Sequence, residues 1–329
     1  MPLVQINAGQ DGLKLHKARH SFIPILRKAL CTPGPIIIMV HGFKFSPGHA
    51  YACPHENILT LNPKRSGWKV KSWPKALGFG IRRRDEGVAI AFGWNGRGSI
   101  WQAYREAGSA AEQLSRLLRV LAHLAPERPV HFLAHSLGAR VVLNAISNVQ
   151  HPTLGRAILL NPAEFCEVAR ERLETSNGRQ LQLINVTSRE NDIFDLLLET
   201  FFAKCGETDR PRCLGRGLFG LSNCLTLQID NPDVVNALAK SGYMLGNKQS
   251  LICHWSTYLR DGVFEFYNDI LRRPHELTLP DMRRTLAHTQ DPRWSKLINR
   301  ARRKVEFTIQ AGFAEFVSSL GSTRSTTNQ

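Results

Sequence analysis

The sequence predicts an α/β fold, in which a mostly parallel central sheet carries helices on both faces. Short apolar runs occur at 35–40 and 88–92, as in strands that are buried on both faces, and 129–134 is predicted as a third strand. Residues 103–124 and 137–146 carry apolar side chains at helical spacing. Because strands and helices alternate along the chain, right-handed βαβ crossovers and a parallel sheet are expected.

The remaining elements continue this alternation. Residues 156–160 and 181–186 are predicted as the fourth and fifth strands, and 262–271 as a helix. The segments 225–229 and 250–253 are alternatives for the last strand. No internal repeat interrupts the order, so a single sheet is expected.

We expect residues 1–273 to form the main domain and 274–329 a basic, helical C-terminal extension. Apolar residues of the extension share one face of an expected helix: Trp294, Leu297, Ile298, Ala301 and Val305. Two long segments, 45–86 and 194–249, interrupt the alternation, and loops of this length are usually functional or mobile. The segment 194–249 begins with an apolar run, so it is expected either as a lid over a catalytic mouth or, equally, as an ordinary packing helix.

Size and charge limit the class of protein. The chain has 329 residues, of which 43% are apolar, enough for a sizeable core. The formal net charge of +16 favours contact with anionic partners or surfaces. No apolar run is long enough to span a bilayer, and the N-terminus lacks the pattern of a signal peptide. We therefore expect a cytoplasmic protein.

The seven cysteines are scattered, and none forms a CxxC pair. This pattern argues against a disulfide framework or a structural zinc site and favours a reducing compartment. One disulfide among Cys205, Cys213 and Cys224 stays open, because these three lie in one short region.

A serine stands between two small residues where a strand is expected to meet a helix, in Ala134-His135-Ser136-Leu137-Gly138. A sharp turn there holds the serine Oγ clear of the sheet, and small neighbours let the helix approach the strand. A serine that caps an ordinary helix is the alternative. The dipeptide His41-Gly42 follows an earlier strand, and His254 comes late in the chain. With these features in this order, the sequence resembles the α/β-hydrolase superfamily over roughly residues 35–271.

The resemblance implies a role for each feature. Ser136 would be the nucleophile and His254 the base that takes and returns its proton. The backbone N–H groups of Leu137 and Phe43 would form an oxyanion hole. We expect His135 to shape the site rather than to act as a second base.

The resemblance also implies an acid between the serine and the histidine. Glu190, Asp192 and Asp195 follow the strand at 181–186. Asp192 fits best because it lies a few residues beyond the strand end, and Glu190 is the second choice. Asp230 and Asp233 would suit families in which the acid follows a later strand.

The sequence therefore predicts a serine hydrolase of the esterase or lipase type, which cleaves carboxylic esters through an acyl-enzyme without a metal or cofactor. Acyl transfer by the same residues is one alternative. A non-catalytic binding protein that contacts anionic surfaces on a hydrolase scaffold is another. The glycines at 93–98 lack the spacing of a dinucleotide-binding loop.

Residues 62–84 combine basic and aromatic side chains and contain no acid. We favour a solvated segment whose aromatic residues pack on the core. An anionic membrane surface or a lipid substrate is the alternative partner, and nucleic acid is unlikely on this pattern. The expected substrate is thus a small-molecule or lipid ester.

Overall fold

The computed structural model describes residues 3–18, 20–64, 67, 69–147, 149, 153–203, 211–248 and 250–295. The strands are β1 (Leu3–Gly9), β2 (Gly12–Leu15), β3 (Ile36–Val40), β4 (Val88–Gly93), β5 (Val130–His135), β6 (Leu154–Leu160), β7 (Gln182–Thr187) and β8 (Cys224–Gln228). The α-helices are α1 (Ile23–Leu30), α2 (Trp73–Ala76), α3 (Ile100–Leu124), α4 (Gly138–Ser147), α5 (Cys166–Glu174), α6 (Asp192–Phe201), α7 (Pro232–Lys240), α8 (Ser256–Leu259), α9 (Val263–Arg272) and α10 (Leu279–Thr285). Short 3-10 helices are η1 (Pro54–Glu56), η2 (Gly178–Gln180), η3 (Arg189–Asn191) and η4 (Leu214–Arg216).

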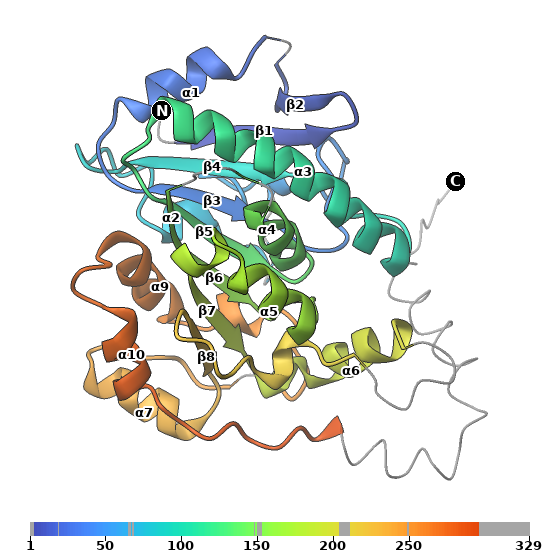
Figure 1. The fold of residues 1–329 in the computed structure, drawn as a ribbon, viewed down its shortest axis with the longest axis vertical. Helices are drawn as coiled ribbons and strands as arrows, with labels where there is room; N and C mark the ends of the chain where they lie inside the picture. The colour runs from blue at the N-terminus through green and yellow to red at the C-terminus, as the bar shows by residue number, and fades with distance from the viewer. Residues whose placement is uncertain are drawn as a thin grey trace, which may run out of the picture. The chain divides into compact units, whose positions relative to one another are not determined.

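Within these residues the strands form one eight-stranded sheet in the order β2-β1-β4-β3-β5-β6-β7-β8 (Figure 1). β2 runs antiparallel to β1, and every other neighbouring pair is parallel. Parallel neighbours require crossover connections, which helices supply here. The predicted α/β class with a mostly parallel sheet is confirmed.

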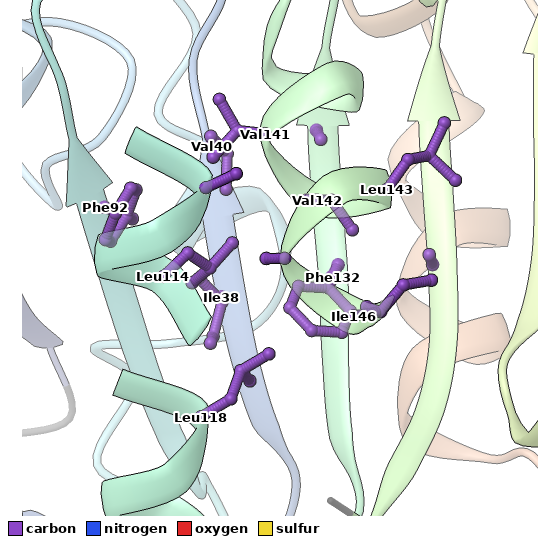
Figure 2. Close-up of a cluster of buried hydrophobic side chains, with 14 of the residues drawn as sticks. Ile38, Val40, Phe92, Leu114, Leu118, Phe132, Val141, Val142, Leu143 and Ile146 are labelled. Atoms are coloured by element: carbon purple, nitrogen blue, oxygen red, sulfur yellow. The ribbon is translucent and has the colours of Figure 1, made fainter. Parts of the chain in front are cut away.

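The two faces of the sheet bury different apolar side chains, because successive residues of a strand point to opposite faces. Ile38 and Val40 pack with Phe132 of β5 and with residues of α3 and α4 (Figure 2). Ile37 and Met39 belong to the cluster on the other face, which includes residues of α9. β3, β4 and β5 are buried along their whole length, which explains the continuous apolar runs of β3 and β4. Each such side chain contributes about 1.5–3 kcal/mol to folding.

The structure settles the last strand and adds two strands at the N-terminus. β8 corresponds to the predicted 225–229 segment, and 250–253 lies in a loop. β1 and β2 precede the first predicted strand. β1 alternates between buried and half-buried residues instead of forming an apolar run, and β2 has only four residues at the sheet edge. Both features weaken the sequence signal of a strand.

The basic segment at 45–86 is anchored by its aromatic side chains. Trp73 and Phe79 are fully buried in the core cluster that covers one face of the sheet. The Trp73 ring meets the Tyr258 ring edge-on at a centroid distance of 5.4 Å. This agrees with the favoured interpretation of a segment whose aromatic residues pack on the core.

The segment at 194–249 is a composite rather than one lid. It holds most of α6, then η4, β8 and α7, and β8 belongs to the central sheet. α6 reaches from the end of β7 to the start of α3, where the indole of Trp101 donates to the carbonyl of Phe201 (3.3 Å). The Tyr104 and Phe202 rings, 4.4 Å apart, extend this contact. α6 therefore covers part of the carboxyl edge of the sheet.

The chain divides into two compact units, Met1–Asp291 and Pro292–Gln329. The first unit extends beyond the expected boundary at residue 273, because α10 packs on the sheet through the buried side chains of Leu279 and Met282. Asp291 adds to this packing by accepting from the side chain of Gln228 (2.7 Å). The helix expected around Trp294–Val305 lies almost entirely outside the described residues.

Two further expectations concern cysteines and membranes. Cys213 and Cys224 are both buried, and Cys205 lies outside the described residues. In the part of the chain that the structure describes, no helix has the length and apolar character to cross a bilayer.

Candidate active site

Ser136 occupies a strained turn between β5 and α4. Its φ is +55°, in the left-handed region that is costly for a residue with a Cβ. The Ser136 N–H donates to the Leu160 carbonyl on β6 (3.0 Å), and the Ser136 carbonyl accepts from the N–H groups of Ala139 and Ala163 (both 3.0 Å). The turn is therefore fixed by three backbone hydrogen bonds. This is the strand–turn–helix context that the five-residue motif requires.

Two glycines allow the backbone to pack closely around this turn. A Cβ built on Gly42 would lie 2.6 Å from the Ser136 Cβ. One built on Gly138 would lie 2.5 Å from the Val40 carbonyl oxygen, at the end of β3. Neither position has room for a side chain, so glycine is required at both. As a result, the loop after β3 lies directly against the Ser136 turn.

Phe43 and Leu137 carry the two expected oxyanion donors. The loop of Phe43 is fixed by its neighbour Lys44, whose N–H donates to the Gly96 carbonyl (2.7 Å). Among the described residues, neither the Phe43 nor the Leu137 N–H donates to another protein group. Both backbone N–H groups are therefore available to an oxygen of a ligand.

His254 lies on the loop before α8, and two donors hold its backbone. The carbonyl of His254 accepts from Nε2 of His135 (2.9 Å) and from Nδ2 of Asn161 (3.0 Å). The His135 and His254 rings lie 4.5 Å apart. Since His135 directly precedes Ser136 in the chain, this contact brings the loop of His254 to the Ser136 turn.

The side chain that meets the imidazole of His254 is an amide. Nδ1 of His254 lies 2.6 Å from Oδ1 of Asn191, and Nδ2 of Asn191 donates to Oδ1 of Asp195 (2.8 Å). A carboxylate only accepts hydrogen bonds, so Asp195 turns the NH₂ group of Asn191 toward itself and the amide oxygen toward His254. Nδ1 must then carry the hydrogen, which leaves Nε2 of His254 as the lone-pair nitrogen.

The sequence-based choice of Asp192 is not supported by this geometry. Asp192 directly follows Asn191, begins α6 and is fully buried. The acceptor for His254 Nδ1, however, is Asn191. Asn191 ends η3 and Asp192 begins α6, and successive residues of a helix lie about 100–120° apart around its axis, so the two side chains leave the backbone in different directions. The structure thus brings His254 and Asn191 together and puts Asp195 behind them.

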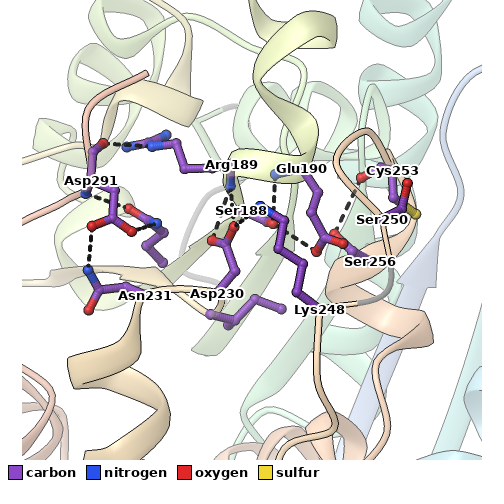
Figure 3. A network of polar contacts seen from close by, with 12 residues as sticks. Ser188, Arg189, Glu190, Asp230, Asn231, Lys248, Ser250, Cys253, Ser256 and Asp291 are labelled. Carbon is purple, nitrogen blue, oxygen red and sulfur yellow. Dashed lines mark hydrogen bonds and ion pairs between the residues drawn. The ribbon is translucent and has the colours of Figure 1, made fainter. Parts of the chain in front are cut away.

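The other acidic candidates have different partners. Glu190 forms a buried ion pair with Arg260 (2.8 Å), and its carbonyl accepts from the Cys253 N–H (2.8 Å). Asp230 accepts from the Arg189 N–H through both oxygens (3.1 and 3.0 Å). Figure 3 shows Glu190, Asp230 and Arg189 in one network of polar contacts. Asp233 is exposed on α7. Glu190 and Asp230 thus hold the segments that they contact in place.

The surroundings of His254 favour its neutral form. Burial, with a smaller contribution from His135, lowers the pKa of His254 well below its ordinary value. The Phe194 ring, 4.8 Å away, helps to exclude water. The Ser136 hydroxyl makes no hydrogen bond to another described residue, His254 included. Such contacts often form only when substrate is bound.

In the described part of the chain, no group of three or more His, Cys, Asp or Glu side chains is arranged to hold a metal ion. What the site offers instead is a hydroxyl on a strained turn, a neutral imidazole and two backbone donors. These are the components of nucleophilic acyl transfer.

The sequence matches the family described as "Alpha/beta hydrolase of unknown function (DUF900)" over residues 18–192, more than half of the chain. The chain belongs to this α/β-hydrolase family. The matched region includes Phe43, Ser136 and Asn191 and ends before His254. A search of curated protein sequences finds no significant match.

Three solved structures align with parts of this α/β hydrolase. The catalytic core domain of acetyl xylan esterase from Trichoderma reesei has a TM-score of 0.25 at 9% identity, with 40% of this chain and 64% of that chain covered. Phospholipase PlaB from Legionella pneumophila has a TM-score of 0.27 at 14% identity, with 54% of this chain and 43% of that chain covered. Acylaminoacyl peptidase from Pyrococcus horikoshii has a TM-score of 0.29 at 12% identity, with 79% of this chain and 38% of that chain covered. The chain thus spans less than two thirds of each, and scores this low carry no functional information.

Asn191 is the site residue that the sequence analysis misses. In the segment Ser188-Arg-Glu-Asn-Asp192 a carboxylate is the usual partner of a catalytic histidine, but an amide oxygen also accepts from Nδ1. The signal that could have found it is the pair Asn191 and Asp195, four residues apart and so on one face of a helix.

Proposed function

We propose that this α/β hydrolase is a serine esterase that cleaves carboxylic esters through an acyl-enzyme, with Ser136 as nucleophile, His254 as base and Asn191 as the residue that orients the base. The observation that carries the proposal is the hydrogen bond between His254 Nδ1 and Asn191 Oδ1, because it leaves Nε2 able to take a proton. Cys-His-Asn sites elsewhere use an amide in the same role.

In the first half of the reaction, Ser136 Oγ attacks the ester carbonyl while its proton passes to Nε2 of His254. The carbonyl oxygen becomes an oxyanion, which the N–H groups of Phe43 and Leu137 stabilise. Removing one such donor in other hydrolases costs about 3 kcal/mol of barrier. The C–O bond of the ester then breaks, and the alcohol leaves with the proton from His254.

In the second half, water attacks the acyl-enzyme. His254 takes a proton from the water and returns it to Ser136 Oγ as the ester bond to the enzyme breaks, which releases the carboxylic acid. The reaction as a whole consumes one ester and one water and yields one acid and one alcohol.

A fluorophosphonate probe tests the proposal, because it reacts with an activated serine. We expect mass spectrometry to find the adduct on Ser136 and 4-nitrophenyl butyrate to be hydrolysed. Ser136→Ala should lose both, with an unchanged circular dichroism spectrum and melting temperature. Folded protein that neither reacts with the probe nor turns over the ester would contradict the proposal and favour a non-catalytic scaffold.

A further inference from the structure

Lys44 places a positive charge beside the expected oxyanion loop. It directly follows Phe43, is exposed, and has a φ of +71°, a strained value for lysine. Its N–H bond to Gly96 (2.7 Å) holds the backbone in this conformation. The Nζ atom lies 5.7 Å from the centroid of the Phe43 ring. The ammonium group is therefore kept next to the loop that packs on Ser136.

Lys69, from the basic segment at 45–86, places a second charge beside the loop of the base. Its Nζ lies 3.7 Å from the centroid of the Trp255 ring, a favourable cation–π distance. Trp255 follows His254, and their rings lie 6.1 Å apart. Partial burial lowers the pKa of Lys69, and repulsion from Lys44 adds to the effect. One ammonium group thus lies at each of the two loops.

Arg97 adds a third positive charge to this rim. Its Nη1 donates to the Lys44 carbonyl (3.3 Å). Of the carboxylates in the described ranges, none forms an ion pair with Lys44 or Arg97. The nearby Glu190 is buried and paired with Arg260. The positive charges of Lys44 and Arg97 repel each other, and a bound anion relieves that repulsion.

We propose that the substrate is an ester that carries its own anionic group, a carboxylate or a phosphate, and that Lys44 and Lys69 bind this group, with Arg97 supporting Lys44. The inference rests on the proposed esterase function and names its substrate class. An ammonium group at each of the two loops can bind an anion on either the acyl or the alcohol side of the ester. Charge-assisted hydrogen bonds to carboxylate or phosphate oxygens would fix its position.

Matched esters test the preference in the intact protein. On the acyl side, mono-4-nitrophenyl glutarate carries a carboxylate and 4-nitrophenyl pentanoate does not. On the alcohol side, acetoxypyrene trisulfonate is anionic and 4-methylumbelliferyl acetate is neutral. We expect kcat/KM to be at least about tenfold higher for the anionic ester in one of the pairs, and 0.5 M NaCl to reduce that ratio.

Charge-removing variants then locate the site. Lys44→Gln and Lys69→Gln should each lower the anionic-to-neutral ratio of kcat/KM about fivefold, in the range of one partly exposed ionic contact. Lys28→Gln on α1 removes the same charge from an exposed position elsewhere and should leave the ratio unchanged. If Lys28→Gln lowers the ratio as much, only net charge matters and the proposed site is excluded.

Different outcomes would contradict the proposed substrate class and the proposed esterase function. Turnover of all four esters without an anionic preference, or a preference that survives in both lysine variants, overturns the inference and leaves the esterase standing. No turnover and no fluorophosphonate adduct overturn both. If anionic esters are preferred, sedimentation with phosphatidylglycerol vesicles distinguishes the two possible sources of the anionic group. Binding that Lys44→Gln weakens indicates a lipid headgroup, and its absence indicates a soluble acid ester.

Discussion

Nδ1 of His254 lies 2.6 Å from the amide oxygen of Asn191. An uncharged partner fixes the tautomer of the imidazole without adding a negative charge beside it. A carboxylate at the same place would stabilise the imidazolium and raise the pKa of the base. Asp195 stands one hydrogen bond further away and orients the amide. The site therefore separates the two effects that one aspartate usually combines: orientation comes from Asn191 and negative charge from a more distant residue.

Removing the amide should disable the base. We expect Asn191→Ala to lower kcat for 4-nitrophenyl butyrate about 10²–10⁴-fold, as when the orienting residue of a triad is altered elsewhere. Asp192→Asn, which keeps the shape of its side chain, should lower kcat less than about tenfold. Steady-state kinetics on variants with native circular dichroism measures both. The opposite order of the two effects would restore Asp192 to the role that the sequence suggested.

The pH profile should report the neutral partner of His254. Because the pKa of His254 is lowered by burial, the imidazole stays unprotonated at neutral pH, and the acid limb of kcat/KM should lie below the pKa of an ordinary histidine. The exchange variant Asn191→Asp with Asp195→Asn puts the carboxylate next to the imidazole. Its acid limb should move about one unit or more to higher pH.

Identical acid limbs in the wild type and the exchange variant would mean that residue 191 does not act on the base. The neutral substrate 4-nitrophenyl butyrate is the appropriate probe, because its own charge does not change with pH.

The close approach of α4 to β3 gives a prediction about packing. In Gly138→Ala the added methyl would lie 2.5 Å from the Val40 carbonyl oxygen, so the Ser136 turn must shift. We expect thermal unfolding at a melting temperature lower by several degrees, with a loss of most activity, because overpacking costs about 1–3 kcal/mol. Gly108→Ala on α3 meets nothing within 4 Å and should stabilise by about 0.5–1 kcal/mol. Equal effects of the two would rule out a specific contact at Gly138.

Most of the framework could be predicted from the sequence because it depends on neighbouring residues. The apolar runs of β3 and β4 and the small residues around Ser136 are local signals. The partner of His254 is not local, since Asn191 lies 63 positions earlier, and the turn type decides whether residue 191 or 192 faces the ring. Glu190, the second choice for the acid, pairs with Arg260, which lies 70 positions away and is likewise not a local signal.

The Glu190–Arg260 ion pair should affect stability more than catalysis. Both side chains are almost fully buried, so Glu190→Gln leaves a buried guanidinium without its counter-charge, and breaking such pairs costs about 3–5 kcal/mol. Urea unfolding should show this loss, while kcat at low temperature stays within about tenfold of the wild type. A loss of kcat beyond about 10³-fold in well-folded protein would instead mark Glu190 as the catalytic acid.

Buried histidines should make the fold sensitive to acid. Burial, with a smaller contribution from Arg156, lowers the pKa of His131 to about 4, whereas an unfolded chain has a histidine pKa of about 6.5. Between these values the unfolded state binds more protons, so stability is complete above about pH 6.5 and falls as pH decreases toward 4. The contribution of His131 is about 3 kcal/mol at most. Its Nδ1 accepts from the Arg156 N–H (3.1 Å), and Asn can replace this acceptor without titrating. His131→Asn should therefore reduce the difference in unfolding free energy between pH 7 and pH 4.5, whereas His123→Asn at an exposed position should not. Urea titrations at the two pH values measure that difference. If the difference in His131→Asn equals that of the wild type, His131 does not cause the acid sensitivity.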